Sequence, residues 1–99
     1  MISGVTEEES KIIVEILKEF YPKYNFFYYG SRVKGNYSKT SDLDILIKGS
    51  QEISLRELVL LKEKFDESRL PYIVNFADYY NIDEHFYNLI KDDLVKIEM

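Results

Sequence analysis

The sequence contains no cysteine, which excludes disulfide bonds and thiolate metal sites. It also lacks a long apolar run: none approaches the ~20 residues that a membrane-spanning helix needs. No secretory signal peptide is recognisable at the N-terminal end of the sequence. We therefore expect a cytoplasmic protein that does not enter a membrane.

An excess of basic residues is missing as well. The 13 lysines and arginines are outnumbered by 18 aspartates and glutamates, which gives a net charge of −5. Proteins that bind long DNA or RNA normally carry a basic face, because phosphate contacts supply most of their nonspecific affinity. We expect no long nucleic acid as a partner. A single nucleotide is compatible with this composition, because a metal ion and backbone N–H groups can neutralise its charge.

The chain is long enough for one hydrophobic core. Its 99 residues predict a single domain, residues 1–99. Apolar residues at helical spacing predict helices after the capping residues Thr6 and Ser54 and a final helix introduced by residues 81–83, with a short helical turn over 31–34. Apolar runs predict strands over 25–29, 43–47, 72–77 and 94–97. This alternation predicts an α/β (or α+β) fold, a small mixed sheet flanked by helices.

A Gly-Ser turn after the first predicted strand has the features of a phosphate site. Gly30 permits a tight turn and a close approach of the backbone to a ligand. Ser31 then stands at a helix N-terminus, where free N–H groups favour a phosphate, and its hydroxyl can add a hydrogen bond. Arg32 and Lys34 follow, and the sequence leaves open whether they are surface charges or contacts to phosphate.

Two carboxylates, Asp42 and Asp44, follow at the start of the second predicted strand. Side chains of a strand alternate between its faces, so the two project the same way, roughly 6–7 Å apart. Like charges this close are unfavourable unless something positive lies between them, and hard oxygen ligands suit Mg²⁺. Together with the Gly-Ser turn, the pair predicts a site for nucleotide phosphates and Mg²⁺, as phosphoryl or nucleotidyl transfer requires.

This motif resembles the signature of the DNA polymerase beta-type nucleotidyltransferases. The residues that carry the resemblance are Gly30-Ser31-Arg32-x-x-Gly35 followed by Ser41-Asp42-x-Asp44. The short length and the segment 70–76 narrow it to the minimal nucleotidyltransferases, small prokaryotic proteins often encoded beside a HEPN-domain partner. The resemblance covers nearly the whole chain.

The resemblance implies a DNA polymerase beta-like fold, with ATP as the substrate contacted by Gly30 and Ser31. It also implies Mg²⁺ ions at Asp42 and Asp44. Some members of the family are antitoxins that transfer AMP from ATP to a tyrosine of a HEPN toxin. A toxin–antitoxin role and this reaction are therefore what the resemblance implies for the present chain.

One position departs from the family pattern. The family has a third carboxylate on a neighbouring strand, which helps to bind metal and activates the acceptor, and this chain has Asn75 there. We count Asn75 with Asp42 and Asp44 as a candidate catalytic residue, although an amide cannot act as a general base. Asp78 lies three residues after Asn75, so in a continuous strand its side chain faces the opposite side of the sheet. A bend after Ala77 would turn it back toward the two acids.

Three functions follow from these observations. The first is Mg²⁺-dependent transfer of AMP from ATP to a protein hydroxyl, with a HEPN protein as partner. The second, which Asn75 motivates, is a catalytically impaired nucleotide-binding module that neutralises its partner by contact alone. The third is transfer to a small molecule such as an antibiotic, which usually needs an additional acceptor domain. The many aromatic residues are compatible with self-association or with a heterologous interface.

Overall fold

The computed structural model describes residues 2–99. Helices and strands alternate along these residues, with a short 3-10 turn near the end. In chain order the elements are α1 (Glu7–Leu17), β1 (Tyr24–Tyr29), α2 (Ser31–Lys34), β2 (Leu43–Gly49), α3 (Leu55–Asp66), β3 (Val74–Asp78), α4 (Glu84–Ile90), η1 (Lys91–Asp93) and β4 (Val95–Lys96). None of the helices described here has the length and apolarity to cross a bilayer.

The strands form one mixed sheet in the order β3-β2-β1-β4. β1 is antiparallel to both β2 and β4, whereas β2 and β3 run parallel. A parallel pair needs a crossover connection, and α3 provides it between these two strands. The predicted α/β fold, a small mixed sheet flanked by helices, is confirmed.

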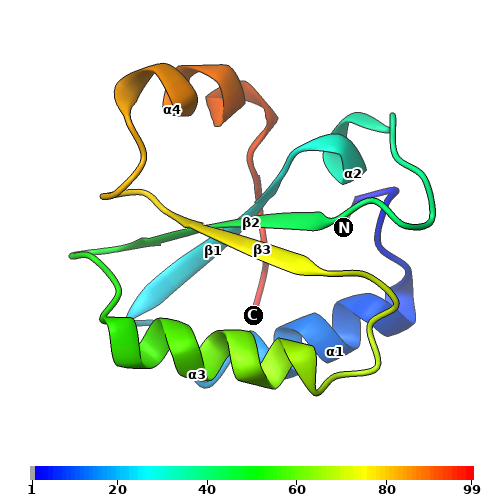
Figure 1. The fold of residues 1–99 in the computed structure, drawn as a ribbon, viewed down its shortest axis with the longest axis horizontal. Coiled ribbons are helices and arrows are strands. Elements are labelled where there is room, and N and C mark those ends of the chain that lie inside the picture. Colours follow the sequence, from blue (N-terminus) through cyan, green and yellow to red (C-terminus); the bar gives the residue numbers. More distant parts are fainter. Residues whose placement is uncertain (1) are drawn as a thin grey trace.

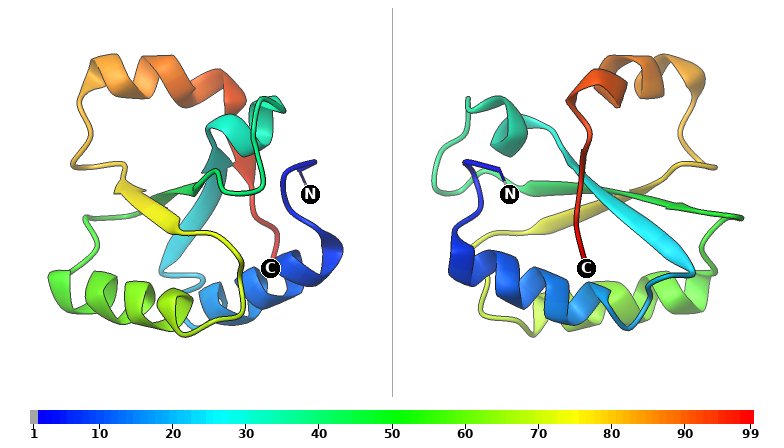
Figure 2. Two further views of the ribbon diagram at one scale, coloured as in Figure 1. Left: turned by 45° about the vertical axis from the view of Figure 1, so that its right-hand side comes forward. Right: turned by 180° about the vertical axis from the view of Figure 1, so that it is seen from behind.

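Helices cover both faces of the sheet (Figures 1 and 2). α1 and α3 lie under one face and bury the larger core, and α4 lies over the opposite face. Side chains of β2 serve both layers: Ile45 and Ile47 enter the larger core, while Leu46 packs with Ile90 of α4. Asp44 has the same parity as Leu46 and therefore faces the α4 side of the sheet.

Side-chain caps begin the three longer helices. Thr6 caps α1 as predicted and forms a capping box with Glu9, in which the Glu9 N–H donates to Thr6 Oγ1 over 3.1 Å and the Thr6 N–H donates to Glu9 Oε1 over 3.0 Å. Ser54 caps α3 as predicted, and Asp83 caps α4. Each cap satisfies an N–H group that has no partner inside its helix.

The bounds of all four strands differ by one or two residues from the predicted ones. β1 begins one residue earlier and β2 ends two residues later than predicted, while α1 ends at Leu17, before a turn over residues 18–23 from which Phe20 packs into the core. β3 begins two residues later than predicted and runs on through Asp78, and β4 is confined to Val95–Lys96. These shifts leave the predicted order of the elements unchanged.

Candidate functional site

The Gly-Ser turn follows β1 directly and brings the backbone of Gly30 against Asp44. Gly30 adopts φ of 87° and ψ of −160°, a conformation that residues with a side chain rarely adopt. A Cβ atom at this position would collide with Oδ2 of Asp44. Glycine is therefore needed for its conformation and for the space it leaves, and the Asp44 carboxylate lies directly against the turn.

Asp42 and Asp44 converge on one nitrogen atom of Asn75. This nitrogen, Nδ2, donates to Oδ2 of Asp42 over 2.8 Å and approaches Oδ1 of Asp44 at 3.4 Å. The parallel register pairs Asp44 with Asn75 across β2 and β3, and Asp42 lies immediately before β2. The structure thus places the three residues together, at the end of the β2–β3 pair that adjoins Gly30.

The site is negatively charged and partly withdrawn from solvent. Burial raises the pKa of Asp44 above its ordinary value, the hydrogen bond from Asn75 opposes that shift, and the charge of Asp42 raises the pKa further. The amide of Asn75 places partial positive charge between the two carboxylates. The point between the two carboxylates, where this amide lies, is one at which a cation would be favoured.

The oxygen atoms of this site fit a hard divalent cation. Asp42 and Asp44 present carboxylate oxygens to a common point, and Mg²⁺ typically binds one or two carboxylates together with waters and substrate phosphates. Within residues 2–99, no group of three or more His, Cys, Asp or Glu side chains is placed to hold a metal. A cation here would therefore depend on the two acids and on oxygen atoms of its nucleotide.

Ser31 and Lys34 lie at opposite ends of α2. Ser31 is the first residue of the helix and is half-buried, and N–H groups of a first helical turn lack an intrahelical acceptor. Lys34 points toward η1, where its Nζ lies 3.7 Å from Oδ2 of Asp93. The Lys34 side chain is 54% exposed, so this pair contributes little to stability. In this structure Lys34 is a surface charge paired with Asp93.

Arg32 departs from both interpretations of the sequence, surface charge and phosphate contact. Its side chain is only 4% exposed. The guanidinium group donates to four backbone carbonyl oxygens, those of Gly4 (2.6 Å), Ser41 (3.0 Å), Lys39 (3.1 Å) and Ser38 (3.4 Å). Because its donors are engaged in this way, Arg32 holds the segment that leads to Asp42 and does not face a ligand.

Two tyrosine rings complete the surroundings of Arg32. Its Cζ atom lies 3.9 Å from the ring centroid of Tyr72 and 5.1 Å from that of Tyr37, a stacking that the planar guanidinium favours. Neither tyrosine is among the candidate site residues that the sequence predicted. No local signal could have found this arrangement, because its members come from segments far apart in the chain.

Removal of the Arg32 guanidinium is expected to destabilise the fold. In Arg32→Met we expect the free energy of unfolding to fall by about 3 kcal/mol, because one buried and three partly buried hydrogen bonds from a charged donor are lost. Arg32→Lys should recover only part of the loss, since an ammonium group lacks the planar fork. Chemical denaturation measures both values, and a loss below about 1 kcal/mol in Arg32→Met would contradict the role assigned to Arg32.

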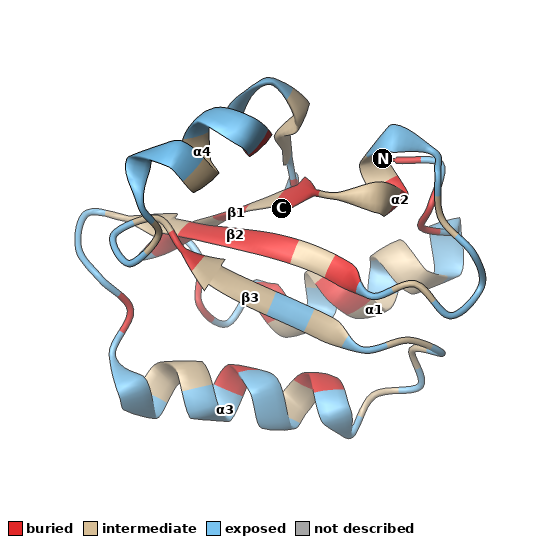
Figure 3. Ribbon diagram, turned by 45° about the horizontal axis from the view of Figure 1, so that its top comes forward, coloured by how far each residue is buried: buried red, intermediate tan, exposed pale blue. Residues whose placement is uncertain are grey.

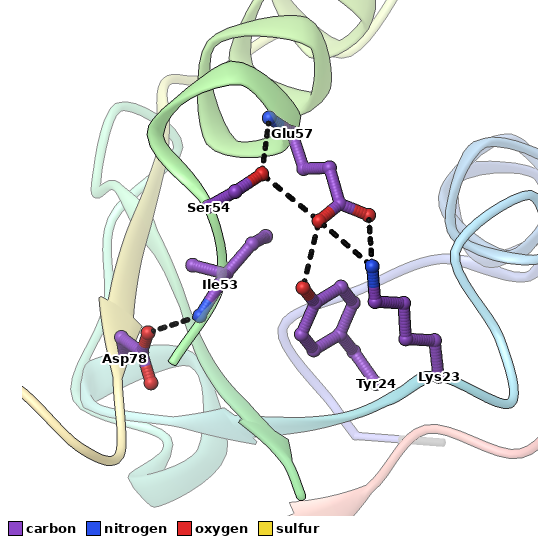
Figure 4. Close-up of polar contacts among 6 residues, drawn as sticks. All are labelled: Lys23, Tyr24, Ile53, Ser54, Glu57 and Asp78. Carbon is purple, nitrogen blue, oxygen red and sulfur yellow. Dashed lines mark hydrogen bonds and ion pairs between the residues drawn. The ribbon is translucent and has the colours of Figure 1, made fainter. Parts of the chain in front are cut away.

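Asp78 does not reach the site. β3 continues through Asp78 without the bend that would have turned it back, so its odd offset from Asn75 directs it to the other face. Asp78 is buried, and its Oδ2 accepts from the Ile53 N–H over 2.8 Å (Figure 4), while Oδ1 accepts from the Tyr80 N–H over 3.0 Å. Asp78 fixes the chain around the end of β3 and does not compensate for Asn75.

Figure 4 also shows a polar cluster that sequence reasoning missed. The Tyr24 hydroxyl donates to Oε1 of Glu57 over 2.8 Å, and Lys23 and Ser54 donate to the same carboxylate. These hydrogen bonds lower the pKa of Glu57, with that from Tyr24 the strongest influence. Tyr24 pairs with Gly49, at the end of β2 away from Asp44, so the cluster fastens α3 to the sheet and is separate from the acids.

Gly30→Ala is expected to disrupt the site. The new methyl group meets the Asp44 carboxylate and the positive φ is strained, so we expect a stability loss of about 1–2 kcal/mol and displacement of Asp44. Gly35→Ala is the matched control, because Gly35 has φ of +92° but a Cβ there meets no atom within 4 Å. Nucleotide titrations should show at least a tenfold loss of affinity in Gly30→Ala. A similar loss in Gly35→Ala would implicate backbone strain instead.

The chain is similar to nucleotidyltransferases over nearly its whole length. Residues 10–99 match the model of the nucleotidyltransferase domain family. The probable protein adenylyltransferase MntA of Haemophilus influenzae is 36% identical over 94 residues, which cover 95% of this chain and 82% of that protein.

Several solved structures share the fold, and two of them are described here. A chain in the crystal structure of a toxin–antitoxin with AMP-PNP has a TM-score of 0.74 and 19% identity, over 90% of this chain and 72% of that chain. A chain in a complex of the tri-AMPylated Shewanella oneidensis HEPN toxin with an MNT antitoxin has a TM-score of 0.66 and 17% identity. That match covers 90% of this chain and 68% of the other.

Proposed function

The chain belongs to the nucleotidyltransferase domain family, and we propose on that premise that it transfers AMP from ATP to a hydroxyl group of a partner protein. The observation that carries the proposal is the convergence of Asp42 and Asp44 beside the Gly30 turn. Carboxylates at that point suit the metal of a metal-bound triphosphate, and the adjoining turn suits its phosphates. The name of the Haemophilus influenzae relative, a probable protein adenylyltransferase, supports the same reaction.

In the proposed reaction, the acceptor oxygen attacks the α-phosphorus of ATP and the bond to pyrophosphate breaks. Backbone N–H groups at Gly30 and Ser31, with the Ser31 hydroxyl, would hold the triphosphate, and Asp42 and Asp44 would hold Mg²⁺. When bound, Mg²⁺ neutralises charge that develops on the phosphate oxygens. Asn75 orients the two carboxylates, and because an amide accepts no proton, the acceptor proton passes to water.

We propose a HEPN-domain toxin as the partner and a tyrosine as the acceptor, with this chain as the antitoxin. The two solved structures described above are both toxin–antitoxin complexes. One contains AMP-PNP, and the other contains a HEPN toxin that carries AMP groups.

Asn75 favours a second candidate function, neutralisation of the partner by contact without transfer. Its amide bridges the two carboxylates in place of a third acid. Loss of a general base typically costs 10²–10⁴-fold in rate, so a chain with Asn75 could bind nucleotide and partner yet turn over slowly. In this alternative the same residues bind nucleotide and partner, but AMP is not transferred.

Incubation of the chain with its HEPN partner, ATP and Mg²⁺ separates the two functions. Intact-mass analysis should show the partner gaining the mass of AMP, and chelation of Mg²⁺ should prevent the gain. A stable complex with no gain in mass would support neutralisation by contact. A partner that neither binds nor becomes modified would contradict both functions.

A further inference from the structure

β3 forms one rim of the sheet, and in the described part of the chain no strand lies on its outer side (Figure 3). Its inner side pairs with β2: the Leu43 N–H donates to the Ile73 carbonyl over 2.9 Å, and the Tyr79 N–H donates to the Ile47 carbonyl over 2.9 Å. In a strand paired on one side, alternate residues direct their backbone groups toward the neighbour. Every second residue of β3 therefore directs its backbone groups outward.

The outward-facing backbone groups belong to Val74 and Phe76, because the hydrogen bonds to β2 at Ile73 and Tyr79 place the alternate residues of that series, Asn75 included, on the β2 side. Proteins usually block such rims with lysine, proline, a bulge or a covering segment. β3 contains neither lysine nor proline, and its one charged side chain, Asp78, is buried and bonded inside the fold. The rim is thus open to an extended polypeptide.

An exposed apolar pair on α3 lies on the same flank as this rim. Leu61 faces the core, and Lys64 pairs with Glu19, near the end of α1, at 2.9 Å. At 100° per residue, Leu55 and Val59 project from the flank of α3 that is turned away from α1, which is the β3 side (Figure 3). Their exposed fractions are 76% and 45%.

We infer that an extended segment of the acceptor protein adds to β3 as a further strand and so brings its hydroxyl group to the acids. The inference rests on the proposed function. The added backbone would pair with Val74 and Phe76, and its side chains on the α3 side would cover Leu55 and Val59. A second copy of this chain on the same rim would cover the acids of both copies, which favours the acceptor as the occupant.

The position of Asn75 explains how such a strand would deliver a side chain. In an antiparallel pairing, the residue opposite Asn75 belongs to a non-hydrogen-bonded pair, with Cα atoms about 4.5 Å apart and side chains close together. Its side chain projects on the same face as Asn75. That is the face where Asn75 contacts Asp42 and Asp44, so a long side chain there would point its hydroxyl at the acids.

Amide hydrogen exchange of the complex with the HEPN partner, measured without ATP, tests the pairing. The amides of Val74 and Phe76 should exchange at least about tenfold more slowly in the complex than in the free chain. The amides of Asn75 and Ala77, which already face β2, are internal controls. Unchanged exchange at Val74 and Phe76 in the complex would overturn the inference, as would protection of both amides by self-association of the free chain.

Kinetics of the same complex test the α3 flank. Leu55→Gln combined with Val59→Gln should raise KM for the protein acceptor about tenfold and leave the stabilisation by ATP unchanged. The matched control is Leu89→Gln, at a 62% exposed position on α4 away from the rim, and it should change neither quantity. Transfer with unaltered KM in the double variant would overturn the docking surface and leave the proposed function standing. Slower amide exchange at Val74 and Phe76 without any transfer of AMP would overturn the proposed function and leave the docking of the partner on β3 standing.

Discussion

Replacement of either Asp42 or Asp44 by alanine is expected to reduce AMP transfer by at least about 100-fold. The two carboxylates converge on one point, at 2.8 Å and 3.4 Å from the Asn75 nitrogen. No third acid among residues 2–99 is placed to share a metal with them. Loss of one acid would therefore leave a cation with a single carboxylate. Transfer to the HEPN partner, followed by intact mass over time, measures the effect.

Asp44→Asn separates this effect from damage to the fold. Because its pKa is raised in the folded state, Asp44 binds a proton more readily folded than unfolded, so its ionisation lowers stability as the pH rises through that range. The neutral variant should melt at the same temperature as the unaltered chain or higher at pH 7, without Mg²⁺, yet fail to transfer AMP. Transfer that survives in Asp44→Asn would refute the assigned role.

Asn75→Asp is expected to raise the rate of AMP transfer by roughly 10²–10⁴-fold. Asn75 lies opposite Asp44 and contacts both acids, so a carboxylate at this position could accept the proton of the acceptor hydroxyl. The variant should also melt at a lower temperature without Mg²⁺, because three like charges would meet there, and should gain more from added Mg²⁺ than the unaltered chain. Initial rates with the HEPN partner and melting curves measure these effects.

Asn75→Ala is the matched control for this gain. It removes the bridging amide without adding a proton acceptor, so the rate should not rise. A gain in Asn75→Ala equal to that in Asn75→Asp would mean that removal of the amide, and not the new carboxylate, is responsible. No gain in either variant would mean that the acceptor proton leaves by a route that does not involve position 75.

The parts of the fold that the sequence predicted depend on local rules. The capping box of Thr6 and Glu9 acts over three residues, and the shared direction of Asp42 and Asp44 follows from the alternation of a strand. The tight turn at Gly30 was predicted from the conformational freedom of glycine. The contact of Gly30 with Asp44 adds a steric reason for glycine at this position. The placement of Asn75 beside the acids was implied by family resemblance, because strand register depends on pairing between distant segments.

The parts that sequence reasoning did not reach are long-range. Arg32 carries a charge in a turn, which ordinarily indicates exposure, but the carbonyl of Gly4 and the ring of Tyr72 bury it. The face on which the Asp78 side chain lies depends on whether β3 bends after Ala77. The hydrogen bond from the Ile53 N–H holds this side chain on the face opposite to Asn75. In both cases the deciding partners are supplied by the tertiary structure and leave no pattern in the neighbouring sequence.

The most direct test of the account is a thermal shift with ATP, with and without Mg²⁺, on the unaltered chain and on Asp42→Asn combined with Asp44→Asn. A ligand that binds only the folded state raises the melting temperature. We predict a rise that requires both ATP and Mg²⁺ in the unaltered chain and is lost in the double variant. An equal Mg²⁺-dependent rise in the double variant would contradict the claim that these two acids hold the metal of the nucleotide.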